Sequence, residues 1–174
     1  MNRVLVLGPC GAGKSMFAAR LGAITRLPVI HLDAEYFRPG WIEPTRDQFA
    51  RKTLSLIAPD RWIIDGNYGA TLELRLEAAD TIIYLDLPRW LCIARVVKRV
   101  FANAGRVRVD MAQGCPERWD WEFMEYVWNF HSESRPRALR RLARFAAGRR
   151  VLFLRTRAQV EDFLSHASRE FSCD

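Results

Sequence analysis

The residues best suited to chemistry form a glycine-rich run near the N-terminus, Gly-Pro-Cys-Gly-Ala-Gly-Lys-Ser at positions 8–15. The run matches the pattern G-x-x-x-x-G-K-[ST], in which glycines let the backbone curl so that successive N–H groups point at phosphate oxygens. The helix expected to follow directs its positive N-terminal end at the same anion. We therefore expect a nucleoside triphosphate site formed by Gly8, Gly11, Ala12, Gly13, Lys14, Ser15 and Met16.

Two side chains of this run have distinct expected roles. Lys14 is placed to reach the outer phosphates, and the Ser15 hydroxyl is placed to bind Mg²⁺. A second magnesium ligand is expected where an apolar run ends in an aspartate, as Trp-Ile-Ile-Asp does at Asp65. The alternative interpretation of Asp65 is a cap on the turn at Gly66.

Two further aspartates follow apolar runs, where ligands gather in a doubly wound sheet. Asp33 ends the run at 28–33 and could act as a general base or position an acceptor, or it could cap the next helix or turn. Asp86 precedes Pro88, and we interpret it as a helix N-cap. His31 lies inside an apolar run, which favours a hydrogen-bonded core histidine over a catalytic one.

Arginine dominates the basic residues, since 24 of the 27 are Arg and three are Lys. Arginine forks onto phosphate oxygens, and phosphoryl transfer needs such cations because charge spreads over the equatorial oxygens. Arg95 and Arg99 are four residues apart and share a helix face, while Arg135 and Arg137 follow a predicted insertion. We expect these four to bind phosphates. For the remaining arginines of the region we prefer a solvated basic face: Arg140, Arg141, Arg144, Arg149 and Arg150.

Five short apolar runs without strict alternation predict strands buried on both faces, at 3–8, 28–33, 61–66, 81–87 and 150–154. Helical patterns separate them, including capping boxes at Thr45 and Thr156 and a helix that begins at Pro88. This alternation predicts an α/β fold with a parallel sheet covered by helices on both faces.

Residues 101–134 break the alternation and predict a helical insertion between the fourth and fifth strands. The aromatic side chains of this insertion are expected to form its own core rather than to stack on bases: Trp119, Trp121, Phe123, Tyr126, Trp128 and Phe130.

The composition of the 174 residues fits one domain. No apolar run is long enough for a membrane span and no signal peptide is apparent, so we expect a cytoplasmic protein without a membrane partner. Net charge +7 favours a polyanionic partner: nucleotide phosphates, nucleic acid or acidic lipid. The cysteines show neither a zinc pattern nor a disulfide pattern and are expected to be free thiols: Cys10, Cys92, Cys115 and Cys173. The oligomeric state does not follow from the sequence.

The glycine-rich run, WIIDGNY and the paired arginines resemble adenylate kinase and the nucleoside monophosphate kinases. More closely, HLDAEYFRPGW, WIIDGNY, DLPRWLCIARVVKR, GCPERWD and VWNF resemble the bacterial DNA-topology-modulation protein family (FlaR-like), which is related to adenylate kinase. The resemblance implies a P-loop NTPase fold with a five-stranded parallel sheet. It divides the chain into a core at 1–32, 61–100 and 135–174, an acceptor-binding segment at 33–60 and a helical lid at 101–134.

By this resemblance the chain is expected to be an ATP-dependent small-molecule kinase that uses Mg²⁺ and moves the γ-phosphate to a nucleotide or another small acceptor. It implies Asp33, Arg38 and Asn67 on the acceptor side, and Arg95, Arg99, Arg135 and Arg137 on phosphates. The arginine of the kinase pattern Asp-Gly-Phe-Pro-Arg-Thr is missing after Asp65, with Arg75 as a candidate substitute. The alternative function is a nucleic-acid-binding ATPase or regulator that affects DNA topology.

Overall fold

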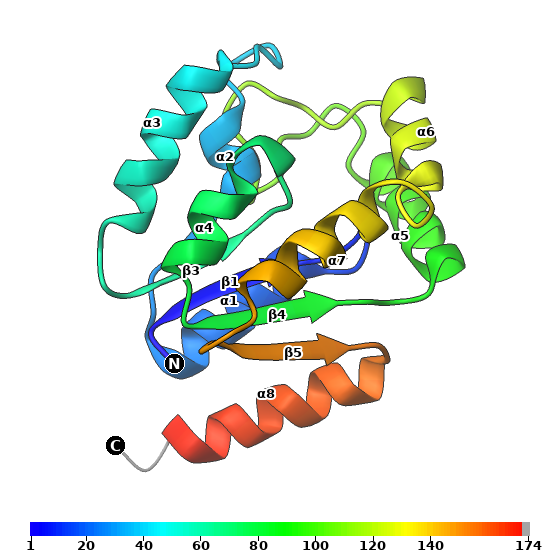
Figure 1. The fold of residues 1–174 in the computed structure, drawn as a ribbon. Helices are drawn as coiled ribbons and strands as arrows, with labels where there is room; N and C mark the ends of the chain where they lie inside the picture. The colour runs from blue at the N-terminus through cyan, green and yellow to red at the C-terminus, as the bar shows by residue number, and fades with distance from the viewer. Residues whose placement is uncertain (172–174) are drawn as a thin grey trace.

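The sheet at the centre of the molecule has five parallel strands in the order β2-β3-β1-β4-β5 (Figure 1). The computed structural model describes residues 1–171, so Cys173 lies outside the described residues. The strands are β1 (Arg3–Leu7), β2 (Val29–His31), β3 (Trp62–Asp65), β4 (Thr81–Leu85) and β5 (Arg150–Leu154). The central strands β1, β3 and β4 are almost wholly buried, which explains why their sequences are continuous apolar runs. The five predicted strands are thus confirmed.

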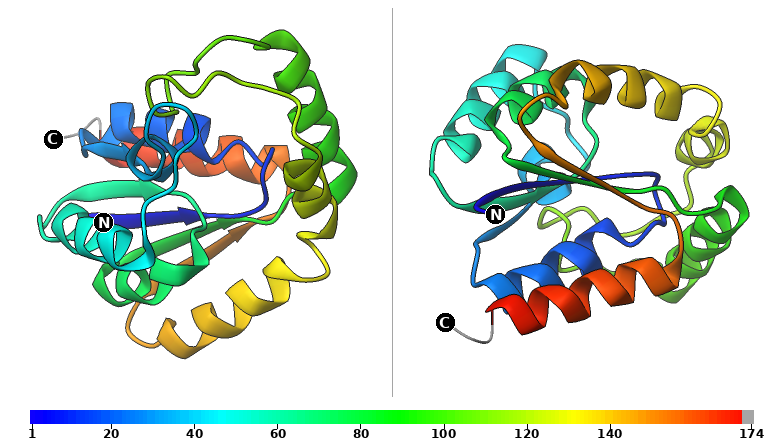
Figure 2. Two further views of the ribbon diagram at one scale, coloured as in Figure 1. Left: turned by 90° about the horizontal axis from the view of Figure 1, so that it is seen from above. Right: turned by 60° about the horizontal axis from the view of Figure 1, so that its bottom comes forward.

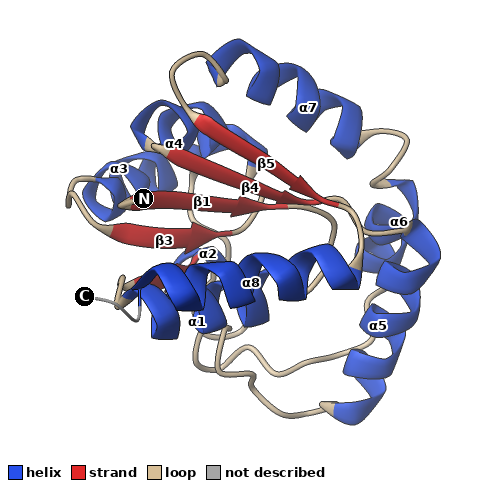
Figure 3. Cartoon of the chain, turned by 90° about the horizontal axis from the view of Figure 1, so that it is seen from below, coloured by secondary structure: helices blue, strands red, loops and turns tan. Residues whose placement is uncertain are grey.

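Helices cover both faces of the sheet, as the sequence predicts (Figures 2 and 3). On one face α1 (Lys14–Thr25) and α8 (Arg157–Phe171) pack together through Phe17, Leu21 and Leu164. The other face carries α3 (Arg46–Ile57), α4 (Leu72–Ala78) and α7 (Ser134–Phe145). Two short elements follow strand ends, α2 (Leu32–Tyr36) and the 3-10 turn η1 (Gly69–Thr71). Within residues 1–171, no helix combines the length and apolarity that a membrane span requires.

Two helices lie beyond the carboxyl ends of the strands, α5 (Arg89–Ala102) and α6 (Trp121–Asn129) (Figure 3). Of the segment predicted as a helical insertion, α6 is helical, whereas residues 103–120 form an irregular loop. The turn formers Gly105, Gly114 and Pro116 explain why no helix continues there.

The expectation that the aromatic residues of this region form its core is wrong for most of them. Trp121 and Trp128 are 76% and 59% exposed, and Trp119 precedes α6. The buried stripe instead runs through Phe123, Val127 and Phe130, because a helix of nine residues has only one face to pack against its neighbours.

The loop at 103–120 packs on the segment that follows α2. Met111 and Cys115 contact Phe37 and Trp41, and the Gly40 N–H donates to the Gly114 carbonyl at 2.9 Å. The segments predicted as acceptor-binding and as lid are therefore in direct contact.

Three predicted helix starts can be compared with the structure. The capping box at Thr45 is confirmed, with Gln48 as its partner. At Thr156 the box is half formed, since the hydroxyl accepts from the Gln159 N–H while the Gln159 side chain accepts from the Arg155 N–H. Pro88 is the N-cap of α5 rather than its first residue.

Asp86, which we interpreted as a helix N-cap, instead binds Arg135 of α7. The guanidinium of Arg135 donates to both carboxylate oxygens, at 2.7 Å each. The pair joins the end of β4 to α7 and lowers the pKa of Asp86 below its ordinary 3.8, although burial opposes the shift.

We expect Asp86→Asn to lower the free energy of unfolding by about 1–3 kcal/mol at neutral pH, the range for hydrogen bonds to charged groups. Because the folded-state pKa is depressed, this stabilisation is present above the unfolded pKa and is lost as the pH falls through the lower folded value. Urea unfolding of both proteins at neutral pH and in acid measures the difference, with the exposed Asp162→Asn as control. A difference independent of pH would contradict the account.

Candidate active site

The glycine-rich run joins β1 to α1 and has a backbone that only glycine permits at two positions. Gly8 and Gly11 have φ of 139° and 82°, and an added Cβ would lie 2.4 Å from the Leu85 carbonyl oxygen and 2.2 Å from that of Cys92. Gly13 is the N-cap of α1 and supplies no side-chain cap, so no side chain occupies the N–H groups of the first turn. The Lys14 ammonium donates to the Pro9 carbonyl at 3.1 Å. This cradle fits phosphate groups.

Ser15 and Asp65 meet at the carboxyl end of the sheet. The Ser15 hydroxyl donates to a carboxylate oxygen of Asp65 at 3.2 Å, and the other oxygen is bound to Nδ1 of His31. A hydroxyl and a buried carboxylate are the oxygen donors that Mg²⁺ prefers, so these residues fit that ion.

His31 belongs to this group rather than to the apolar core in which the sequence suggested it. Its side chain is 21% exposed, and the hydrogen bond with Asp65 raises its pKa above the ordinary value. The pairing of β2 with β3 is the signal that could have located His31, because it places His31 beside Asp65 at the ends of these neighbouring strands.

Asp33 of α2 and Asn67 of the loop after β3 follow neighbouring strands, β2 and β3. The Tyr68 hydroxyl donates to Asp33 at 2.7 Å, so the carboxylate of Asp33 is oriented by its neighbour. Asn67 binds the main chain of Gly8 in both directions, accepting from its N–H at 3.2 Å and donating to its carbonyl at 2.8 Å. The Asn67 side chain therefore fixes the position of the glycine-rich run at residues 8–15, which we call the phosphate loop.

The predicted phosphate-binding arginines occupy different places. Arg95 lies against the phosphate loop, 3.3 Å from the carbonyls of Gly11 and Ala12. Arg99 pairs with Glu117, and Arg135 pairs with Asp86. Arg137 is exposed on α7 and forms no ion pair within residues 1–171.

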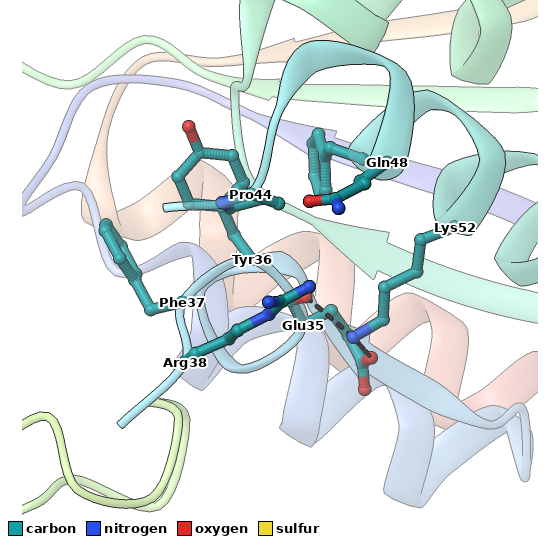
Figure 4. Close-up of a pocket in the computed structure, with 8 residues that line it drawn as sticks. Glu35, Tyr36, Phe37, Arg38, Pro44, Gln48 and Lys52 are labelled. Carbon is teal, nitrogen blue, oxygen red and sulfur yellow. Dashed lines mark hydrogen bonds and ion pairs between the residues drawn. The ribbon is translucent and has the colours of Figure 1, made fainter. Parts of the chain in front are cut away.

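Arg38 lines a pocket of about 110 Å³ between α2 and α3, next to Tyr36, Phe49 and Lys52. Its side chain extends along the pocket toward Glu35, which is paired with Lys52 (Figure 4). The pocket belongs to the segment that the sequence assigned to an acceptor.

Arg108 is, with His31, a residue near this group that the sequence does not predict. It comes from the loop at 103–120, where its guanidinium lies 3.0 Å from Glu117 and 4.0 Å from Asp33. No local motif marks Arg108 among 24 arginines, and only the return of the loop over α2 brings it to Asp33.

Arg75 cannot replace the missing arginine of the kinase pattern, because its side chain is fully buried. It donates to three successive carbonyls, those of Gly66 at 2.8 Å, Asn67 at 2.6 Å and Tyr68 at 2.9 Å. Burial lowers the pKa of Arg75 to about 9. The residue thus shapes the loop that presents Asn67 and Tyr68.

We expect Arg75→Met to destabilise the fold by about 2–4 kcal/mol, because three carbonyls lose a charged donor while the cost of burying the guanidinium is recovered only in part. Arg137→Met, at an exposed position of α7, is the matched control and should change the free energy of unfolding by less than about 0.5 kcal/mol. Urea titration measures both. Equal effects of the two substitutions would contradict the structural role of Arg75.

No family model and no curated protein matches the chain. Solved structures do match its fold. The shikimate kinase from Acinetobacter baumannii in complex with shikimate has a TM-score of 0.63 at 13% identity, covering 99% of this chain and 94% of that one. The shikimate kinase from Bacteroides thetaiotaomicron has a TM-score of 0.52 at 15% identity, and the match covers 98% of each chain. A sugar kinase from Janibacter sp. has a TM-score of 0.52 at 16% identity, and the match covers 99% of this chain and 96% of that one.

The chain therefore has a P-loop kinase fold of the type seen in shikimate kinase. At these identities the comparisons establish the fold alone. They do not show the DNA-topology-modulation family that the sequence resembles.

Proposed function

We propose that the protein is an ATP-dependent kinase that transfers the γ-phosphoryl group to a hydroxyl of a small acceptor. The observation that carries the proposal is the meeting of three features at one edge of the sheet: an uncapped phosphate loop, the Ser15–Asp65 pair and the oriented carboxylate of Asp33. This edge is where α/β proteins of this kind bind their ligands.

The donor side of the proposed reaction is formed by the phosphate loop. Its N–H groups and Lys14 bind the phosphates of ATP. Arg95 supports the loop by donating to the carbonyls of Gly11 and Ala12. Ser15 and Asp65 would hold Mg²⁺, which neutralises charge on the phosphate oxygens when bound.

The acceptor side is formed by Asp33 and the segment that follows it. Asp33 accepts the proton of the attacking hydroxyl at one carboxylate oxygen, while Tyr68 holds the other. Arg38 supplies a cation for an anionic group of the acceptor. Shikimate kinase and sugar kinase, the similar folds, are named for small polyhydroxyl substrates, which supports a hydroxylated acceptor.

The alternative of a nucleic-acid-binding ATPase stays a prediction from the sequence. The structure assigns several arginines to internal contacts: Arg75, Arg135, Arg141 and Arg149. The high arginine content therefore does not by itself favour a nucleic acid.

The proposed function is tested by measuring ADP release from MgATP with pools of hydroxy acids, sugars, nucleosides and nucleoside monophosphates. We expect at least one pool to raise ADP release above the rate with ATP alone, and a pool of hydroxylated acids is the first choice. The proposal would be contradicted if no pool raised ADP release, or if a pool still raised it with the Lys14→Ala variant.

A further inference from the structure

Glu117 is a buried carboxylate that lies between two arginines. Its side chain is 6% exposed, 3.2 Å from Arg99 of α5 and 3.0 Å from Arg108 of the loop at 103–120. Its main chain is fixed as well, since its carbonyl accepts from Gly105 and its N–H donates to Arg106, at 2.9 Å each. Glu117 is therefore held in place by both its backbone and its side chain.

The two arginines that Glu117 joins border the space between the phosphate loop and Asp33. Arg108 lies 4.0 Å from Asp33, and Arg99 lies 5.8 Å from the ring of Phe123 on α6. Burial raises the pKa of the Cys10 thiol in the phosphate loop, and the charges of Lys14, Arg99 and Arg108 oppose this. Phe123 packs in the same cluster as Cys10, which places Arg99 near the phosphate loop.

The position of this pair depends on the carboxylate between its members. Two guanidinium groups repel each other, and long arginine side chains lose conformational entropy when they are held in one geometry. The carboxylate of Glu117 offsets both effects. Asp110 also lies near Arg108, at 3.5 Å, but that contact does not involve Arg99. Glu117 therefore joins the two guanidiniums, and Asp110 and Asp33 are the other carboxylates beside Arg108.

We propose that Glu117 is a positioning residue that holds Arg99 and Arg108 toward the γ-phosphoryl group, so that this pair distinguishes a nucleoside triphosphate from a diphosphate. The proposal rests on the proposed function, because that function places the γ-phosphoryl group between the phosphate loop and Asp33. A nucleoside diphosphate lacks the γ-phosphoryl group that the pair would contact, so the pair should favour the triphosphate. A purely structural pair would not discriminate between the two nucleotides.

The test compares affinities for a non-hydrolysable ATP analogue and for ADP, both with Mg²⁺, by isothermal titration calorimetry. We expect Glu117→Gln to weaken binding of the analogue about tenfold, a loss near 1.4 kcal/mol, and to change ADP binding less than about twofold. Arg108→Gln should have the same selective effect, and it keeps the test valid if Glu117→Gln fails to fold. Thermal unfolding of each variant monitors the fold.

Glu73→Gln is the matched control. Glu73 of α4 also lies between two arginines, 3.9 Å from Arg141 and 3.5 Å from Arg144, both of α7. We expect this variant to bind both nucleotides like the wild type.

The outcomes separate the two proposals. Equal weakening of both nucleotides, or no change in either, would overturn the role of Glu117 while wild-type binding still supports a nucleotide site. A wild-type protein that binds neither nucleotide would refute the proposed function and this inference with it.

Discussion

Lys14→Ala should lower phosphoryl transfer by at least about a thousandfold, because charge stabilisation by one cation at the transferring group can contribute 10³ or more. Lys14 is partly buried in the phosphate loop, where its ammonium has only the Pro9 carbonyl as its hydrogen-bond partner within residues 1–171. An alanine leaves the backbone cradle in place, so the loss should appear in turnover rather than in stability. Steady-state rates with MgATP and the identified acceptor measure the effect.

Lys98→Ala provides the control for this prediction. Lys98 is one of the three lysines and is exposed on α5. Its removal changes the net charge by the same amount without touching the phosphate loop. We expect unchanged turnover, with thermal unfolding of both variants close to the wild type. Retained turnover in Lys14→Ala would exclude the phosphate loop from the reaction.

Asp33→Asn should lower the turnover number by about 10²–10⁴, the contribution typical of a positioned general base. The amide keeps the size of the carboxylate and accepts the hydrogen bond from Tyr68, so the geometry of α2 is preserved. ATP affinity should change little, because the proposed function places Asp33 on the acceptor side. Turnover and ATP binding, measured on the same preparation, separate the two effects.

Asp47→Asn is the control for Asp33→Asn, since Asp47 is an exposed acid in the first turn of α3. The alternative that Asp33 caps a helix is wrong, because His31 is the N-cap of α2 and Asp33 lies in its first turn. A purely structural Asp33 would give the opposite result: reduced stability with turnover retained. Unfolding free energies therefore decide between a catalytic and a structural aspartate.

The fold could be predicted from sequence because its determinants are local. Each central strand is buried on both faces, so each appears as a continuous apolar run, and the phosphate loop is a contiguous motif between β1 and α1. The position of Asp65 could be predicted for the same reason, since it directly ends the apolar run of β3.

The partners of the charged residues could not be predicted, because they depend on contacts between distant segments. Arg135 and Asp86 are separated by 49 residues, and their pairing follows from how α7 crosses the sheet. Arg108 reaches Asp33 only through the fold of an irregular loop. Arg75 has the residue type of a phosphate ligand, but its burial makes it a structural donor to backbone carbonyls.

Mass spectrometry distinguishes phosphoryl transfer from hydrolysis when an acceptor is incubated with the protein and with ATP whose terminal phosphoryl oxygens carry oxygen-18. Direct transfer moves all three labelled oxygens with the phosphorus, so one acceptor should gain about 86 Da instead of the 80 Da of an unlabelled phosphoryl group. We expect this gain with the wild type and no gain with Lys14→Ala. Labelled inorganic phosphate as the sole product, with no acceptor modified, would contradict the proposed function.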